Sequence, residues 1–141
     1  MTIIGEGISH RGLISEDFHY PFYVTGTVTA ADVGKAVAID ATAPRAVKLA
    51  GDGDVIVGVL VSYENRAIEG TVVGTVAMKG GFRLQKDAAA AAIVIGDSVV
   101  GGATSGEVGP RRNAGNTLNE PDHSFNIVTA VSGTDVEVII K

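Results

Sequence analysis

The residue types that most often do chemistry are present in this chain, but none occurs at a spacing that identifies a site. His10, His19 and His123 lie far apart, and none has a ligand-type side chain two or four positions further on. A metal site would depend entirely on the fold to gather them. The absence of cysteine excludes disulfides, thiolate zinc sites and cysteine nucleophiles. We therefore predict no metal site and no cofactor.

Three further motifs resemble known sites only in part. Asp52 and Asp54 have the D-x-D spacing of a calcium loop, but no Asp or Asn follows at the next ligand spacing and no Glu closes the loop, so a turn is the better interpretation. The Gly-rich stretch 101–109 lacks the Gly-Lys-Ser/Thr ending of a phosphate loop. Ser, His and Asp are present without a Gly-x-Ser-x-Gly elbow. We therefore predict no catalytic residues and no enzymatic activity.

Any functional side chains would have to be positioned by short strands. Val- and Ile-rich runs, clearest at 55–61, 71–78 and 136–140, alternate with Gly, Asp, Asn and Ser breakers. This pattern predicts a single all-β domain over 24–141, mainly antiparallel. The Ala-rich run at 86–93 is the one place where a helix competes, and we expect one or two helical turns there, hence at most one short helix.

Residues 1–23 differ from the rest and are predicted to form an extended N-terminal arm. Pro21 lacks a backbone donor, which argues against helix and against a central strand. The aromatic residues near Pro21 have two open interpretations: they plug one end of the core, or they anchor a partner. Removing residues 1–23 is accordingly expected to leave a folded β domain. The predicted partner-binding residues of this segment are Phe18, His19, Tyr20, Phe22 and Tyr23.

A second candidate contact is the pair Arg111 and Arg112 at the start of the aperiodic segment 110–124. Guanidinium groups bind carboxylates in bidentate fashion, so the pair could form an intersubunit salt bridge, although a solvated loop is the commoner situation. The net charge of −5 argues against sequence-independent nucleic-acid binding. No secretory signal and no apolar run of membrane-spanning length occurs, so we expect a soluble protein made in a cytoplasm, without membrane partners.

Five short motifs follow one another in a fixed order over residues 30–140. They are Gly34-Lys35-Ala36-Val37, Gly58-Val59, the segment 76–80, the segment 93–99 and Gly106-Glu107-Val108. This order resembles the small capsid decoration (cement) proteins of tailed bacteriophages. The segments 1–23 and 110–124 have no counterpart in that pattern.

The resemblance implies both a fold and a function. It implies a compact β-barrel or β-sandwich (β-tulip-like) that forms a homotrimer, binds the major capsid protein on the outside of an expanded icosahedral phage head, and stabilises contacts between capsid subunits. The protein would then be part of the virion exterior after synthesis in the host cytoplasm. Two alternatives belong to other classes: a glycan- or surface-binding β module displayed on a particle, and a trimeric β-fold nucleotide hydrolase. The missing Trp and the lack of a phosphate loop count against them.

Overall fold

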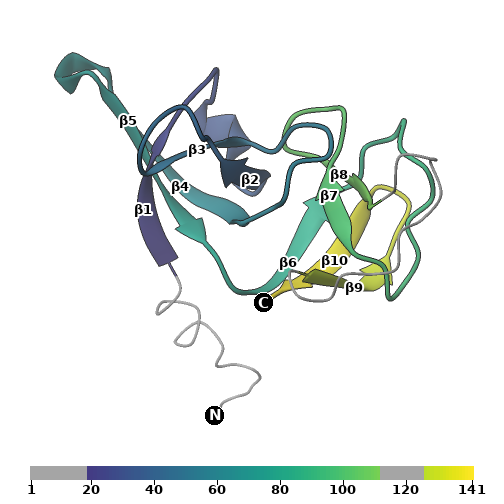
Figure 1. Ribbon diagram of the computed structural model, residues 1–141. Helices are drawn as coiled ribbons and strands as arrows, with labels where there is room; N and C mark the ends of the chain where they lie inside the picture. Colours follow the sequence, from purple (N-terminus) through teal and green to yellow (C-terminus); the bar gives the residue numbers. More distant parts are fainter. Residues whose placement is uncertain (1–18, 112–125) are drawn as a thin grey trace, which may run out of the picture.

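The computed structural model describes residues 19–111 and 126–141, and all regular structure among them is β apart from two short 3-10 turns. The predicted all-β class is confirmed (Figure 1). The turns are η1 (Ala30–Asp32) and η2 (Ala67–Glu69). The strands are β1 (His19–Val24), β2 (Ala36–Ile39), β3 (Ala46–Leu49), β4 (Gly58–Arg66), β5 (Thr71–Ala77), β6 (Gly80–Gln85), β7 (Val99–Gly101), β8 (Val108–Pro110), β9 (Asn126–Val131) and β10 (Asp135–Ile140).

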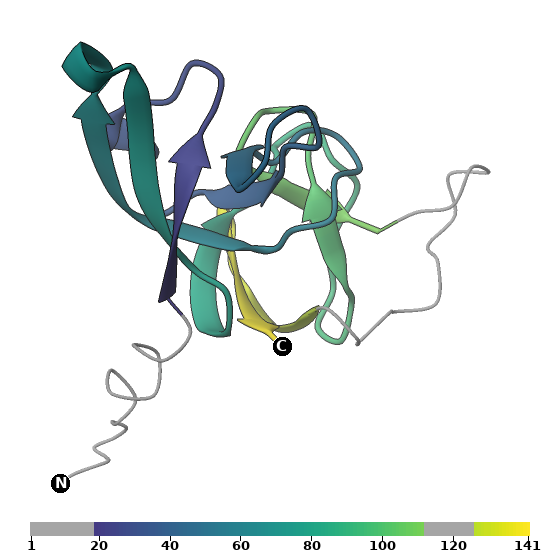
Figure 2. The same ribbon diagram turned by 60° about the vertical axis from the view of Figure 1, so that its left-hand side comes forward.

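Five strands close into a barrel in the order β1-β3-β2-β4-β5. Neighbours are antiparallel except β1 and β3, which are parallel. The remaining strands form a three-stranded antiparallel sheet, β6-β10-β9, and the pair β7-β8. The described body is therefore a small mixed barrel with two antiparallel sheets packed on it (Figures 1 and 2).

The molecule has two hydrophobic cores, and β2 contributes to both because its side chains alternate between faces. Val37 points into the barrel, where it packs in one buried cluster with Leu60 and Val76. Ala36 and Ala38 point the other way and join the core between the barrel and the second sheet. Alanines on this outer face allow the second sheet to approach closely, and burial of its aliphatic side chains stabilises that junction.

Strand β1 corrects the predicted arm over its last five residues. Residues 19–23 pair with β5 along their whole length, whereas pairing with β3 involves only Tyr23 and Val24. The N–H of Tyr23 donates to the carbonyl of Arg45 beside β3 (2.9 Å). By alternation the missing donor of Pro21 lies on the same edge, where β3 does not reach, so the proline breaks no ladder bond. Residues 1–18 of the arm lie outside the described residues.

The Ala-rich run forms a turn and an extended segment, so the helical turns expected at 86–93 were wrong. The Asp87 carboxylate accepts hydrogen bonds from the backbone N–H groups of Ala89 (3.0 Å) and Ala103 (2.8 Å). The N–H of Ala90 donates to the Asp87 carbonyl (3.0 Å), and Ile93 is buried in the second core. Asp87 and these tertiary contacts override the helix propensity of five alanines, which is too short a run to hold a helix unaided.

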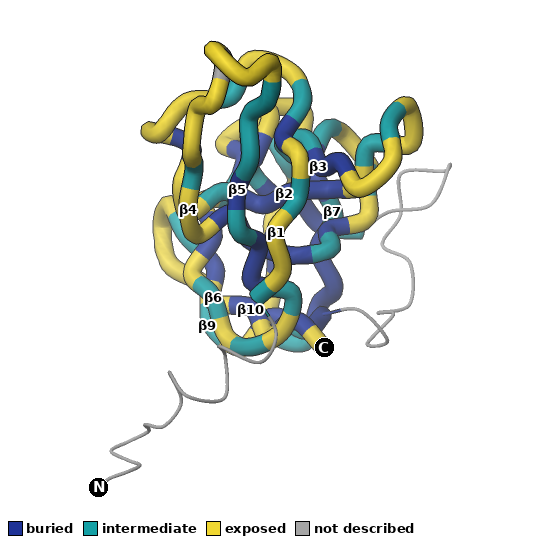
Figure 3. Tube along the Cα trace, turned by 90° about the vertical axis from the view of Figure 1, so that its left-hand side faces the viewer, coloured by how far each residue is buried: buried dark blue, intermediate teal, exposed yellow. Residues whose placement is uncertain are grey.

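The hairpin β4–β5 extends beyond the barrel (Figures 1 and 2). Ladder pairing of β4 with β2 is confined to Gly58 and Val59, while pairing with β5 continues out to Arg66 and Thr71. From Val61 onward, β4 is exposed or only partly buried (Figure 3). We call this projecting part, residues 61–73 with η2 at its tip, the β4–β5 hairpin tip segment.

Candidate functional site

The predicted aromatic contacts are divided between the core and the surface of β1. Phe22 is partly buried and packs against the barrel core, as in the core interpretation. Tyr20 and Tyr23 remain 50% and 48% exposed, and His19 is partly exposed. Two tyrosines on a rigid strand are thus available to a partner, because aromatic rings in that state supply contact area at small entropic cost. Phe18 lies outside the described residues.

The two tyrosines lie on opposite faces of β1. Tyr20 shares the inward face with Phe22 and is exposed at the strand's open end, whereas Tyr23 is on the outward face. Tyr23 is opposite Val73 of β5, which is in turn opposite Glu64 of β4. A row of aromatic, aliphatic and acidic side chains therefore crosses the outside of three adjacent strands.

The structure does not bring the arginine pair to this surface. Arg111 follows β8, and its N–H donates to the carbonyl of Ser98 (3.1 Å). The end of β8 and strand β1 are on opposite sides of the molecule in Figures 1 and 2. Arg112 lies outside the described residues, so the predicted pair cannot be placed as one site. The β1 tyrosines and Arg111 are separate surface features.

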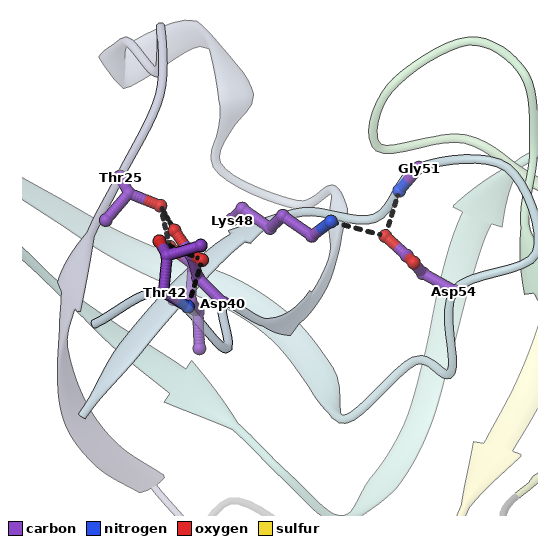
Figure 4. Close-up of polar contacts among 7 residues, drawn as sticks. Thr25, Asp40, Thr42, Lys48, Gly51 and Asp54 are labelled. Atoms are coloured by element: carbon purple, nitrogen blue, oxygen red, sulfur yellow. Dashed lines mark hydrogen bonds and ion pairs between the residues drawn. The ribbon is translucent and has the colours of Figure 1, made fainter. Parts of the chain in front are cut away.

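A hydroxyl–carboxylate cluster joins the end of β1 to the β2–β3 turn (Figure 4). The Asp40 carboxylate accepts from the hydroxyls of Thr25 (2.5 Å) and Thr42 (2.6 Å) and from the N–H of Thr42 (2.9 Å). These hydrogen bonds, that of Thr25 foremost, lower the pKa of Asp40 from 3.8 to about 2. A carboxylate of that pKa is a weak base at neutral pH, so the cluster fits a clamp between strands better than a nucleophile with its base.

The Asp40 carboxylate makes the stability of the fold depend on pH in the acid range, and the direction of this dependence is predictable. Its folded pKa lies below the ordinary value, so its stabilising contribution is complete at neutral pH and is lost as the pH falls from 3.8 toward about 2. Asp40→Asn should lower the thermal unfolding midpoint at neutral pH, and this deficit should shrink in that acid range. Thermal unfolding followed by circular dichroism checks this, with Asp52→Asn on an exposed turn as control. A deficit that is constant with pH would contradict it.

A second polar contact holds the turn between β3 and β4. Asp54 accepts from the N–H of Gly51 (2.9 Å) and forms an ion pair with Lys48 (3.1 Å) (Figure 4). Partial burial raises the pKa of Asp54, but the Gly51 N–H and the Lys48 ammonium together lower it by more, so it lies below its usual value. The predicted D-x-D turn is thus stabilised by its own second aspartate, whose side chain accepts from the backbone N–H three residues earlier.

The most deeply buried polar side chain is also structural. Asn126 is 2% exposed; its Oδ1 accepts from the N–H of Val99 (2.8 Å) and its Nδ2 donates to the carbonyl of Val99 (3.0 Å). The hydroxyl of Ser98 donates to the Asn126 carbonyl (3.3 Å). The side-chain amide of Asn126 therefore makes the two hydrogen bonds that a neighbouring strand would make to Val99, and it joins β9 to β7. Fully satisfied buried groups of this kind fix a fold rather than bind a ligand.

Two surface features were missed from the sequence. Ile68, in η2 at the end of the β4–β5 hairpin tip segment, is fully exposed. On the outer face of the β6-β10-β9 sheet, a shallow depression lies beside Ile139, which is 43% exposed. The depression is lined by Gly81, Phe82, Arg83, Thr129, Glu137, Val138 and Ile139. The available signal for the first of them was an isoleucine inside the otherwise polar stretch 64–70.

Among residues 19–111 and 126–141, no three His, Asp or Glu side chains gather closely enough to hold a metal ion. In the same part of the chain no helix has the length and hydropathy needed to cross a membrane. No protein family, curated protein or solved structure matches this chain. The fold and the surface together define a small all-β barrel protein with exposed aromatic and aliphatic side chains.

Proposed function

We propose that the chain is a structural virion protein that binds the outside of an icosahedral phage head as a homotrimer and stabilises contacts between major capsid subunits. The observation that carries the proposal is the packing of the five motifs against one another in adjoining cores, with Val37 and Val76 in the barrel core and Ile93, Val99 and Val108 in the second core. Two of them touch directly: the N–H of Ala36 donates to the carbonyl of Gly106 (3.2 Å). Gly106 has a φ of +85°, and a Cβ added there would come within 2.7 Å of the Lys35 side chain.

The other motifs pack against the same cores. Gly58 faces β5 so closely that an added Cβ would lie 2.4 Å from the carbonyl oxygen of Ala77. Ile93, Val99 and Val108 pack in the second core. Motifs that lie far apart in the sequence are thus one packed unit. This supports their interpretation as scaffold residues of a decoration protein rather than as separate ligand sites.

The physical logic of a decoration protein fits a rigid barrel with few surface contacts. Each contact with a capsid subunit can be weak, because a symmetric trimer engages several subunits at once and the linked contacts multiply in effect. Tyr20 and Tyr23 supply the anchors: half-exposed aromatic rings on a strand that is paired to β5 along its length. The net charge of −5 is too small to require a positively charged partner surface for binding.

Replacing both anchors tests this function. The double variant Tyr20→Ser, Tyr23→Ser should bind expanded phage heads at least about tenfold more weakly than the wild type. Co-sedimentation over a concentration series measures the effect, and Thr27→Ser at another exposed position is the matched control.

The outcomes separate the proposal from its alternatives. Unchanged thermal unfolding of the double variant would show that lost binding is a surface effect. Binding equal to the wild type would exclude these tyrosines as anchors. Wild-type protein that ignores heads but binds sugars on a glycan array, or hydrolyses nucleoside triphosphates, would replace the decoration function by one of the two alternatives.

A further inference from the structure

The carboxylate of Asp87 is buried and is held by three backbone N–H groups. The residue is 6% exposed. Its Oδ1 accepts from the N–H of Ala89 (3.0 Å), and its Oδ2 accepts from the N–H groups of Ala103 (2.8 Å) and Thr104 (3.4 Å). Backbone N–H groups that converge on one point form an anion-binding concavity, because their dipoles are fixed in direction. The three donors therefore have the geometry of a carboxylate-binding site.

The negative charge of Asp87 is balanced by these N–H groups and by no cation among the described residues. None of the ion pairs in that part of the chain includes Asp87. The N–H groups, that of Ala89 foremost, lower the pKa of Asp87 by more than burial raises it, and no charged side chain contributes. The backbone of Asp87 also meets uncharged groups, the carbonyl of Val108 (2.9 Å) and the N–H of Ala90 (3.0 Å). The site thus stabilises an anion through N–H donors alone.

The carboxylate reaches this site because Gly102 has no side chain. A Cβ added to Gly102 would lie 2.8 Å from the Cβ of Asp87 and 3.0 Å from its Oδ2. A side chain there would push the carboxylate away from the N–H of Ala103. The N–H of Gly102 donates to the carbonyl of Glu107 (2.8 Å), which closes the loop between β7 and β8.

The loop that supplies two of the three N–H groups also contacts the barrel. It consists of residues 102–107 between β7 and β8 (Figure 1), and we call it the bridging loop. The N–H of Gly106 donates to the carbonyl of Ala50 (2.9 Å), and the carbonyl of Gly106 accepts from the N–H of Ala36 in β2 (3.2 Å). Asp87 follows β6 of the second sheet. The bridging loop is therefore bonded to the barrel through Gly106 and to the second sheet through the Asp87 carboxylate.

We propose that the three N–H groups form a binding site for a small monocarboxylate, that the Asp87 side chain fills this site in the native protein, and that its occupancy keeps the bridging loop closed. When the Asp87 carboxylate is removed, the site takes an external anion of the same shape. Formate matches the variant Asp87→Ala, because alanine keeps the Cβ and leaves a space of the size of one carboxylate. The inference concerns a single chain and does not depend on the decoration function.

Rescue by formate tests the binding site. Asp87→Ala should raise the equilibrium constant of unfolding at least about tenfold at neutral pH, because three N–H groups lose a charged acceptor. Sodium formate at about 0.5 M should lower this constant again by about threefold or more. Sodium chloride at the same concentration should not, and neither should pivalate, which is too large for the space. Urea unfolding followed by circular dichroism gives the constant.

Asp97→Ala is the matched control for the rescue. Asp97 is similarly buried (8% exposed), but among the described residues its carboxylate accepts from a single backbone N–H, that of Val94 (2.9 Å). Its removal should destabilise the fold without leaving a site that formate fills. Formate that stabilises both alanine variants equally would overturn the proposal, and so would chloride that stabilises Asp87→Ala as well as formate does.

Amide exchange tests whether the occupied site keeps the bridging loop closed. In Asp87→Ala the N–H of Ala103 should lose its protection from exchange, and so should the N–H of Ala36, which donates to the other end of the loop. The N–H of Val138, a buried residue in the second sheet, should stay protected. Formate should restore protection at Ala103 and Ala36. Undiminished protection of Ala36 in Asp87→Ala would show that the carboxylate does not keep the loop closed.

The wild-type chain offers a test that does not require a variant to fold. Because the site binds the anion, the Asp87 carboxyl group should titrate below its ordinary value of 3.8 when its carbon signal is followed by NMR. The N–H of Ala103 should lose protection over the same pH range, since protonation removes the charged acceptor. A midpoint at or above 3.8, or protection of Ala103 that does not follow this titration, would overturn the proposal even if Asp87→Ala does not fold.

Discussion

We expect a chain lacking residues 1–23 to lose cooperative thermal unfolding and a chain lacking residues 1–18 to keep it. The longer deletion removes β1, which pairs with five residues of β5 and closes the barrel against β3. It also removes Phe22, which packs on the barrel core, and leaves β5 with an open edge. The shorter deletion retains every described strand. Thermal unfolding monitored by circular dichroism and by amide exchange distinguishes the two.

The comparison between the two deletions contains its own control, because they differ only by five residues. Equal unfolding midpoints for the two chains would contradict the assignment of 19–23 to the barrel and would restore the interpretation of these residues as an arm. If the full chain binds heads and the chain lacking residues 1–18 does not, the first 18 residues contribute to the capsid contact.

Asn126→Asp should lower the free energy of unfolding by about 3–5 kcal/mol at neutral pH. The new carboxylate oxygen replaces the amide group that donates to the Val99 carbonyl, so two acceptors face each other in a site that is 2% exposed. The substitution also buries a charge, and the hydrogen-bond partners of Asn126 among residues 19–111 and 126–141 are Ser98 and Val99, neither of which is a cation. Urea denaturation gives the free energy, provided that the transition stays two-state.

Asn65→Asp is the matched control for this substitution. It makes the same chemical change at an exposed position on β4 and should alter the free energy of unfolding by less than about 0.5 kcal/mol. A destabilisation of Asn126→Asp that also stays below about 1 kcal/mol would show that β7 and β9 are not joined through this amide.

Alternation of side chains was the signal that made the strands predictable. In β10 the alternate residues Val136, Val138 and Ile140 are buried, and Glu137 and Ile139 are exposed. Alternation follows from the backbone geometry of a single strand, so it can be recognised in the sequence without knowing the partner strand. The mixed pairing of the barrel was not accessible, because β1 and β3 are parallel and far apart in the chain.

The wrong predictions concern residues whose local conformational preference is overridden by contacts with residues far away in the sequence. Pro21 argues against a strand unless the backbone edge on which its missing N–H would lie has no partner strand. Only the register of β3, which pairs with Tyr23 and Val24, shows that this edge is unpaired at Pro21. The alanines of 86–93 favour helix until Asp87 is seen to accept hydrogen bonds from residues more than a dozen positions away. The candidate surfaces depend on the same long-range facts, since Ile68 is exposed only because β4 pairs with β2 over two residues.

The most direct test of the proposed decoration function is co-sedimentation of the full wild-type chain with expanded phage heads. We expect saturable binding, with the number of bound chains a multiple of three per head and no binding to unassembled capsid protein. A chain that stays in the supernatant at every concentration up to about 100 µM would contradict the account.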